Sequence, residues 1–254
     1  MKIIIVKNKI EGGKKALEIY RATLKSNARV LGFATGSTPL TTYQELIKSD
    51  LDFSQIISFN LDEYVGLQAD DPQSYHHYME ENLFKFKKFK TSFLLNGVAV
   101  DEKAEIRHYD QLLEKYPIDL QLLGIGRNGH IGFNEPGSSF NERTHKVGLT
   151  ESTIKANSRF FADEVQVPRY AYSMGIKSIL AAKQILLEAY GSSKASAVLR
   201  MVQGPMTTAR PASILQTHPN VTLILDEAAA SQLSKVKKED DIYANSFKTC
   251  QNLY

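Results

Sequence analysis

An acidic pair, Asp62-Glu63, follows a run of mainly apolar residues from Ile56 to Leu61. A carboxylate that is partly removed from water can have a raised pKa and act as a general base. A carboxylate pair after a strand can instead cap the segment that follows it. Both interpretations stay open on position alone, and Asp62 is a candidate for proton transfer.

A second acid–base candidate lies in a glycine-rich stretch. His130 and Glu135 stand five residues apart in it, and Asn128 comes just before them. A loop histidine with a carboxylate nearby suits proton transfer, because the carboxylate can hold one tautomer and orient the ring. Zinc binding is the rival interpretation. One His and one Glu without a nearby Cys are too few ligands, so we expect no metal.

The stretch Thr35-Gly-Ser-Thr-Pro39 is a candidate phosphate-binding loop. Gly36 lets the backbone approach an anion, and the hydroxyls of Ser37 and Thr38 and the amides of a helix start supply donors. It is not a Walker A loop, because the Gly-Lys-Ser/Thr ending is missing. A helix start without a ligand, capped by Thr38 and with Pro39 at the first helical position, explains the stretch equally well.

Two basic residues in turn-like contexts could add to an anion site. Arg159 stands in Asn157-Ser-Arg-Phe-Phe161, and Lys194 stands in Gly191-Ser-Ser-Lys-Ala195. We expect Lys194 in the first turn of a helix that follows a strand, where an anion is stabilised. Taken singly, each residue is more typical of a plain surface charge.

The stretch Gly124-Ile-Gly-Arg-Asn-Gly129 matches the spacing of a dinucleotide-binding loop. That motif needs a helix to open at its third glycine, so that the amide ends meet the pyrophosphate. Here Gly132 and Pro136 follow, and both disfavour a helix. We therefore expect no nucleotide cofactor and interpret the glycines as a tight turn after a strand.

The composition narrows the class of protein. The 254 residues include 31 basic and 28 acidic side chains, interleaved along the chain, with a net charge of +3. This is unlike the basic surface of a nucleic-acid-binding protein, so we expect no nucleic-acid partner. A single cysteine, Cys250, excludes an internal disulfide, and no run approaches the ~20 apolar residues of a membrane span. We expect a cytoplasmic protein with no membrane partner.

Strand-like and helix-like segments alternate, which is typical of an α/β fold with a mostly parallel sheet covered on both faces. The expected strands are residues 3–6, 29–34, 56–61, 119–125, 171–174, 184–189 and 221–225. The expected helices are residues 11–25, 75–84, 102–116, 178–182, 192–202 and 227–233. His76 and His77 are adjacent on one of these helices, so we expect their rings to point apart as surface residues. We expect one domain, residues 1–233, and a polar tail, residues 234–254.

The candidate site residues share a position relative to the expected strands. Residues 35–38, 62–63 and 128–135 each follow the carboxyl end of one of them. In open α/β sheets this edge is where ligands bind. We therefore expect these three segments to meet in one cleft.

Six strings in order resemble one known family. They are Thr35-Gly-Ser-Thr-Pro39, Phe59-Asn-Leu-Asp-Glu-Tyr-Val-Gly66, Gly126-Arg-Asn-Gly-His-Ile-Gly-Phe-Asn-Glu-Pro-Gly137, Asn157-Ser-Arg-Phe-Phe161, Gly191-Ser-Ser-Lys-Ala195 and Leu215-Gln-Thr-His-Pro219. Together they resemble the glucosamine-6-phosphate deaminase family over roughly residues 1–230. Several motifs in the family's order are far more specific than any one of them.

The resemblance implies a Rossmann-like three-layer α/β sandwich without a metal or nucleotide cofactor. It implies an enzyme that converts glucosamine 6-phosphate, an amino sugar phosphate, to fructose 6-phosphate and ammonia. Asp62 would be the base that moves a proton between C2 and C1, His130 would open the sugar ring, and Glu135 would orient it. The implied phosphate contacts are Gly36, Ser37, Thr38, Arg159 and Lys194.

Two departures matter within the resemblance. Family members carry Asp or Asn at position 128, and this chain has Asn128, whose amide cannot stabilise an imidazolium as a charge. Ring opening would then rely more on Glu135. His145 and Val147 stand where members activated by N-acetylglucosamine 6-phosphate carry Arg and Lys. The resemblance therefore implies the short, non-allosteric type, a monomer or a small homo-oligomer.

Three alternatives remain. A galactosamine-6-phosphate deaminase would use the same chemistry on another amino sugar. A 6-phosphogluconolactonase would not require the Phe59-Asn-Leu-Asp-Glu-Tyr64 motif. A sugar-phosphate effector-binding module is the alternative from another class. Related regulators carry an N-terminal helix-turn-helix, whereas this chain begins with an expected strand.

Overall fold

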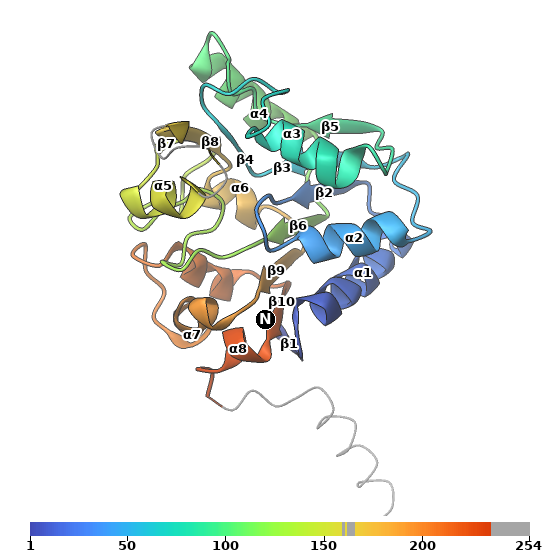
Figure 1. Ribbon diagram of the computed structural model, residues 1–254, viewed down its shortest axis with the longest axis vertical. Helices are drawn as coiled ribbons and strands as arrows, with labels where there is room; N and C mark the ends of the chain where they lie inside the picture. Colours follow the sequence, from blue (N-terminus) through green and yellow to red (C-terminus); the bar gives the residue numbers. More distant parts are fainter. Residues whose placement is uncertain (159–160, 162–165, 235–254) are drawn as a thin grey trace, which may run out of the picture.

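A seven-stranded parallel sheet forms the centre of the molecule (Figure 1). The structure, a computed structural model, describes residues 1–158, 161 and 166–234. In spatial order the strands are β1 (Lys2–Val6), β10 (Val221–Asp226), β9 (Ile185–Ala189), β6 (Leu120–Leu123), β2 (Val30–Phe33), β3 (Ile57–Asn60) and β5 (Thr91–Phe93). Every neighbouring pair is parallel. β2, β6 and β9 are buried throughout, because a parallel sheet is covered on both faces.

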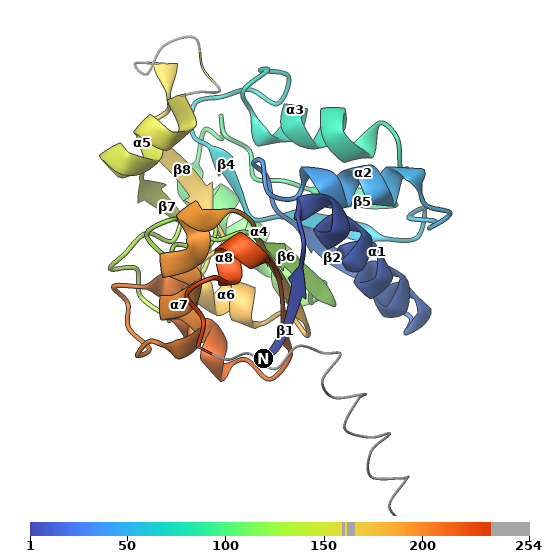
Figure 2. The same ribbon diagram turned by 60° about the horizontal axis from the view of Figure 1, so that its bottom comes forward.

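Helices cover both faces of the sheet and make three layers (Figures 1 and 2). Connections between parallel strands are right-handed. The connections that lead toward β5 in the strand order therefore place their helices on one face, and those that lead back toward β1 place theirs on the other. One face carries α1 (Lys9–Lys25), α2 (Leu40–Lys48) and α3 (Tyr75–Met79), which continues into the π-helical turn η1 (Glu80–Phe84). The other carries α4 (Glu102–Lys115), α6 (Ile176–Leu180), α7 (Ala195–Gln203) and α8 (Glu227–Ala230). The expected Rossmann-like three-layer α/β fold is confirmed.

The ends of several helices differ from the expectation. α1 begins at Lys9, two residues early, because the side chain of Asn8 accepts two backbone N–H groups of the first turn at 3.0 and 3.1 Å. α6 begins at Ile176, also two residues early, and α8 ends at Ala230 rather than at residue 233. The expected helix at residues 75–84 is present as α3 and η1.

The prediction that Thr38 caps the helix after β2 is wrong. α2 begins at Leu40, Pro39 occupies the cap position, and no side chain accepts a hydrogen bond from the first turn. Thr38 therefore does not cap α2. The first-turn N–H groups of α2 keep their capacity to donate to another acceptor.

A second sheet of three antiparallel strands stands beside the main one, and the sequence did not predict it. It consists, in order, of β4 (Asp62–Tyr64), β8 (Tyr170–Ser173) and β7 (His145–Gly148). β3 ends at Asn60, so Asp62 opens a new strand instead of ending the apolar one. β4 is three residues long and begins with two carboxylates, which gives no alternating apolar pattern.

The strand order changes direction between β2 and β6. From β2 the chain moves outward through β3 and β5, and from β6 it moves the opposite way through β9 and β10. In doubly wound sheets such a switch point, outside the carboxyl ends of the strands, binds ligands. Residues 35–38 follow β2 and residues 124–130 follow β6, so both stretches lie at the switch point.

The two ends of the described chain meet in the main sheet, because β1 pairs with β10. The division into a domain of residues 1–233 and a tail of residues 234–254 stays a prediction, since residues 235–254 lie outside the described part. Within the described part, no helix combines the length and the apolar character that crossing a bilayer requires.

Strand β9 carries a buried carboxyl group, Glu188, on the face that α2 covers. Glu188 is 0% exposed and accepts hydrogen bonds from the hydroxyls of Thr42 at 2.6 Å and Tyr190 at 3.2 Å. Burial raises the pKa of Glu188 to about 7, because desolvation outweighs these two hydrogen bonds. The folded-state pKa lies above the unfolded value of ~4.3, so stability is greatest below that value and falls as the pH rises toward 7.

Replacing Glu188 with Gln should raise the free energy of unfolding by roughly 1–3 kcal/mol at pH 8 and change it little at pH 4. Glutamine keeps the size and most of the hydrogen-bonding capacity and removes the penalised charge. Urea unfolding at the two pH values measures the difference, with exposed Glu18→Gln on α1 as the control. The same gain at both pH values would show that the charge of Glu188 is not the cause.

Candidate active site

The loop after β2 has the backbone that an anion site needs. Gly36 has a φ of +90°, in the left-handed region that favours glycine, and its carbonyl accepts a hydrogen bond from the Tyr78 hydroxyl at 2.6 Å. Ser37 is exposed at the tip of the loop. Thr38 faces the loop after β6, because a Cβ on Gly124 would lie 3.8 Å from the Thr38 Oγ1. Two hydroxyls and the start of α2 therefore meet at the switch point.

Lys194 reaches the same edge from β9. It ends the 3-10 turn η4 (Ser192–Lys194) and is the cap residue of α7, so the α-helix begins at Ala195, three residues later than expected. Its Nζ donates to the carbonyl of Ile125 at 2.6 Å, so the ammonium lies beside the loop after β6. Arg159, the other expected cation, lies outside the described residues. The structure thus brings one predicted cation to the loop after β6, which Thr38 also faces.

Glu135 is the centre of a polar network in the loop after β6. It is 5% exposed and accepts hydrogen bonds from the Asn128 amide at 2.6 Å and from the Thr153 hydroxyl. Its Oε1 lies 3.4 Å from Nδ1 of His130, which is long for a hydrogen bond but close enough to orient the ring. Asn128 also accepts the backbone N–H of His130 at 3.1 Å. The Asn128 side chain therefore contacts the backbone of His130 and not its imidazole ring.

The network keeps a negative charge behind the imidazole. Burial would raise the pKa of Glu135. The nearby imidazole of His130 and the hydrogen bonds from Thr153 and Asn128 outweigh the effect of burial and hold the pKa of Glu135 below its usual value. Thr153 lies on α5 (Glu151–Asn157) and was not predicted from the sequence, because nothing local in its segment signals a distant carboxylate.

Gly126 allows the ring of His130 to fold back over its own loop. A Cβ at position 126 would lie 2.4–2.5 Å from three atoms of that ring, so any other residue there would displace the ring. The backbone closes the turn through a hydrogen bond from the Gly126 N–H to the His130 carbonyl at 2.9 Å. No helix opens at Gly129, in agreement with the rejected dinucleotide motif. These glycines place a histidine at the switch point.

Asp62 is a buried carboxyl group at the start of β4. It is 6% exposed, and burial, together with the negative charge of Glu63, raises its pKa to about 8. A carboxyl group with such a pKa can take up and release a proton near neutral pH.

Strand β8 brings Asp62 to the loop after β6. Asp62 lies opposite Ser173 in the ladder of β4 and β8, and the Ser173 hydroxyl accepts the backbone N–H of Phe133 at 3.1 Å. A Cβ on Gly132 would lie 3.7 Å from the Asp62 Oδ2. The second sheet therefore places the buried carboxyl group against the loop that carries His130.

The fold defines a class of protein, a doubly wound α/β protein, whose switch point gathers residues able to bind an anion and to transfer protons. The anion loop and Lys194 can hold a phosphate, and Asp62 and the pair His130–Glu135 can move protons. Within the described residues, no three His, Cys, Asp or Glu side chains gather as a metal-binding group.

The chain belongs to the family of glucosamine-6-phosphate isomerases and 6-phosphogluconolactonases, whose model matches residues 11–224. A glucosamine-6-phosphate deaminase of Pediococcus pentosaceus is 62% identical over 234 residues, which make up 92% of this chain and 99% of the relative. The deaminase of Ligilactobacillus salivarius is 61% identical over 233 residues, 92% of this chain and 100% of the relative. The expected family is confirmed.

Solved structures agree with the fold. The structure of a monomeric glucosamine-6-phosphate deaminase superimposes with a TM-score of 0.88 at 45% identity and covers 92% of this chain and 100% of its own. The 6-phosphogluconolactonase from Trypanosoma brucei superimposes with a TM-score of 0.76 at 19% identity and covers 92% of this chain and 98% of its own. At that identity the lactonase is informative about the fold alone.

Proposed function

We propose that the chain converts glucosamine 6-phosphate and water to fructose 6-phosphate and ammonia. One observation carries the proposal: a buried carboxyl group, Asp62, whose raised pKa suits proton transfer, lies against the loop of His130 and Glu135 at the switch point. Curated relatives that are 56–62% identical over 92% of the chain are named glucosamine-6-phosphate deaminases and support it. The single cysteine fits a cytoplasmic enzyme.

The reaction begins when the sugar ring opens. His130 takes the proton of the O1 hydroxyl and delivers a proton to the ring oxygen, which breaks the bond between C1 and that oxygen. Glu135 holds the ring of His130 and compensates the positive charge that the imidazole carries during the transfer. Asn128 fixes both partners without adding a charge of its own. The product is an open-chain aldehyde.

Isomerisation and deamination follow. The aldehyde at C1 acidifies the hydrogen on C2, and the Asp62 carboxylate takes it as a proton while O1 is protonated. Asp62 then returns the proton to C1, and the nitrogen loses one, which leaves an imine at C2. Water adds to this imine, and ammonia departs from C2 to leave the ketose phosphate. Gly36, Ser37, Thr38, Arg159 and Lys194 hold the phosphate, which keeps the reacting carbons in place.

Replacing Lys194 with Ala should raise KM about 10–100-fold, because a hydrogen bond to a charged group contributes ~1.5–3 kcal/mol. The kcat should change less, because Lys194 contacts the phosphate rather than the reacting carbons. Initial rates against substrate concentration measure both constants. Lys183→Ala, at the amino end of β9, is the control. An unchanged KM would show that the phosphate binds elsewhere.

The substrate is tested by offering three compounds to the purified chain: glucosamine 6-phosphate, galactosamine 6-phosphate and 6-phosphogluconolactone. We expect ammonia from the glucosamine compound at a rate well above that from its galactosamine epimer, and no hydrolysis of the lactone. Lactone hydrolysis without ammonia release would make the chain a lactonase. Binding of a sugar phosphate without turnover would make it an effector-binding module.

We expect hyperbolic kinetics without activation by N-acetylglucosamine 6-phosphate, and a monomer or small homo-oligomer. His145 and Val147 lie on β7, where valine has no donor for a phosphate and a neutral imidazole is a poor substitute for a guanidinium. The 45% identical monomeric deaminase supports this. Initial rates with and without the effector, together with the mass by light scattering, check it. A sigmoidal curve that the effector makes hyperbolic would contradict it.

A further inference from the structure

Glu63 is a buried carboxylate directly after Asp62 on β4. It is 1% exposed and accepts four hydrogen bonds, two at each oxygen. Its Oε1 accepts the backbone N–H groups of Tyr64 at 2.8 Å and Tyr75 at 2.9 Å. Its Oε2 contacts the backbone N–H of His76 at 2.9 Å and the Nδ1 of the same residue at 3.0 Å. The arrangement suits a carboxylate, which accepts at both oxygens and donates at neither.

These hydrogen bonds connect β4 to the start of α3. Tyr75 and His76 are the first two residues of α3, where free N–H groups attract a negative charge. The Tyr75 ring in turn stacks on Phe133 of the His130 loop, with ring centroids 6.0 Å apart and an interplanar angle of 5°. Glu63 therefore fixes the strand that carries Asp62 relative to α3 and, through Tyr75, to the loop that carries His130.

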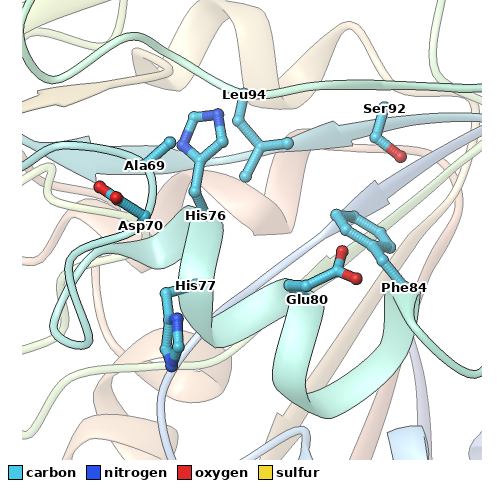
Figure 3. A pocket seen from close by; sticks show the side chains of 8 residues that line it. All are labelled: Ala69, Asp70, His76, His77, Glu80, Phe84, Ser92 and Leu94. Carbon is cyan, nitrogen blue, oxygen red and sulfur yellow. The ribbon is translucent and has the colours of Figure 1, made fainter.

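His76 connects this buried carboxylate to solvent. Its side chain is 30% exposed and lines an open groove of about 500 Å³ beside α3 (Figure 3). Figure 3 shows His76 and His77 pointing apart from adjacent positions of the helix, as the sequence predicted. The expectation that both are plain surface residues is wrong for His76, because its Nδ1 contacts Glu63. The spacing on a helix predicts that the two rings point apart, but it cannot predict that the Glu63 carboxylate lies next to one of them.

We propose that Glu63 and His76 form a positioning pair for the base: Glu63 holds strand β4 in place and supplies a negative charge beside Asp62, and His76 holds the Glu63 carboxylate in that position through its Nδ1. The proposal rests on the proposed function. Neither residue touches the sugar carbons in this mechanism, so both act through Asp62.

The sign of the effect follows from the charges. The negative charge of Glu63 is the second cause, after burial, of the raised pKa of Asp62. The Nδ1 of His76, 3.0 Å from the Oε2 of Glu63, holds this carboxylate from the side that faces the groove. The other titratable groups around the pair are Tyr75, His77 and Glu80 on α3 and η1, Asp70 in the preceding loop, Tyr109 on α4 and Tyr172 on β8.

The first test does not depend on turnover. The Asp62 carboxyl group is followed by carbon NMR of protein labelled at aspartate, and its signal is assigned by its loss in Asp62→Asn. We expect Glu63→Gln to lower the titration midpoint of Asp62 by about one pH unit. His77→Asn, which changes the neighbouring ring on the same groove, should leave it unmoved. A midpoint that is the same in Glu63→Gln and the wild type would overturn the proposal.

The second test separates positioning from a merely structural role. We expect Glu63→Gln to lower kcat about 10–100-fold with little change in KM, and to move the acid limb of the pH profile to lower pH. His76→Leu, which removes the donor, should lower kcat in the same direction. His76→Asn should restore it, because the amide nitrogen stands where Nδ1 stood. The His76 variants leave the buried carboxylate in place, so they decide the matter even if Glu63→Gln does not fold.

The outcomes distinguish the two proposals. A wild-type chain that releases no ammonia, with the expected shift of the Asp62 midpoint, would overturn the proposed function and leave the pair intact. An active wild type with unchanged kcat in His76→Leu would overturn the pair alone. Equal losses in His76→Leu and His76→Asn would also contradict it, because only the first removes the hydrogen bond.

Discussion

Replacing Asp62 with Asn should lower kcat by about 10²–10⁴-fold, the usual range for a lost general acid or base. Asparagine has nearly the same shape, but it cannot take the proton from C2 or return one to C1. Steady-state rates of ammonia release measure the loss. The control is Asp50→Asn, which removes an exposed carboxylate that pairs with Arg21.

The same substitution should not destabilise the fold. Burial raises the pKa of Asp62 to about 8, above the unfolded value of ~3.9, so its stability contribution is present below the unfolded value and lost as the pH rises to about 8. Asp62→Asn should therefore be at least as stable as the wild type at pH 8. This is typical of an active site, where function is kept at the expense of stability. A wild-type rate in the variant, or a loss of rate that follows unfolding, would contradict the role of base.

Replacing His130 with Gln should lower kcat by about 10²–10⁴-fold, because it slows the opening of the sugar ring. Glutamine can form hydrogen bonds but cannot carry a proton from O1 to the ring oxygen. Ring opening should then limit the rate, and deuterium at C2 of the substrate should slow the variant hardly at all. In Asp62→Asn, removal of the C2 hydrogen limits the rate, and deuterium should slow the reaction strongly. His108→Gln, on the exposed face of α4, is the control.

The comparison of the two variants is the informative part. A large isotope effect in His130→Gln would place His130 at the carbon rather than at the ring oxygen. An unchanged kcat would remove it from the mechanism. Both outcomes are distinct from loss of the fold, which circular dichroism of each variant checks.

The sheet could be predicted from the sequence wherever its strands are continuous apolar runs. β2, β6 and β9 are buried throughout, so their residue types alone indicate them. β5 and β7 were not predicted, because their side chains are exposed or alternate without a strong apolar face. Their place depends on pairing with strands that are distant in the sequence, and pairing leaves no local signal.

The site could be predicted as far as its residues follow strands. The glycines around His130 and the carboxylates at positions 62 and 135 stand out, because they follow apolar runs at the binding edge of the sheet. Thr153 and His76 could not be found this way. Each contacts a buried carboxylate from a helix elsewhere in the chain, and only the tertiary structure brings them together.

The central claim is that one site both isomerises and deaminates an amino sugar phosphate. The most direct measurement incubates the purified wild-type chain with glucosamine 6-phosphate and follows ammonia and fructose 6-phosphate together. We expect both products to rise at the same rate and in equal amounts, and Asp62→Asn to slow both by the same factor of about 10²–10⁴. Fructose 6-phosphate without ammonia, ammonia without the ketose phosphate, or no product from a folded chain would contradict it.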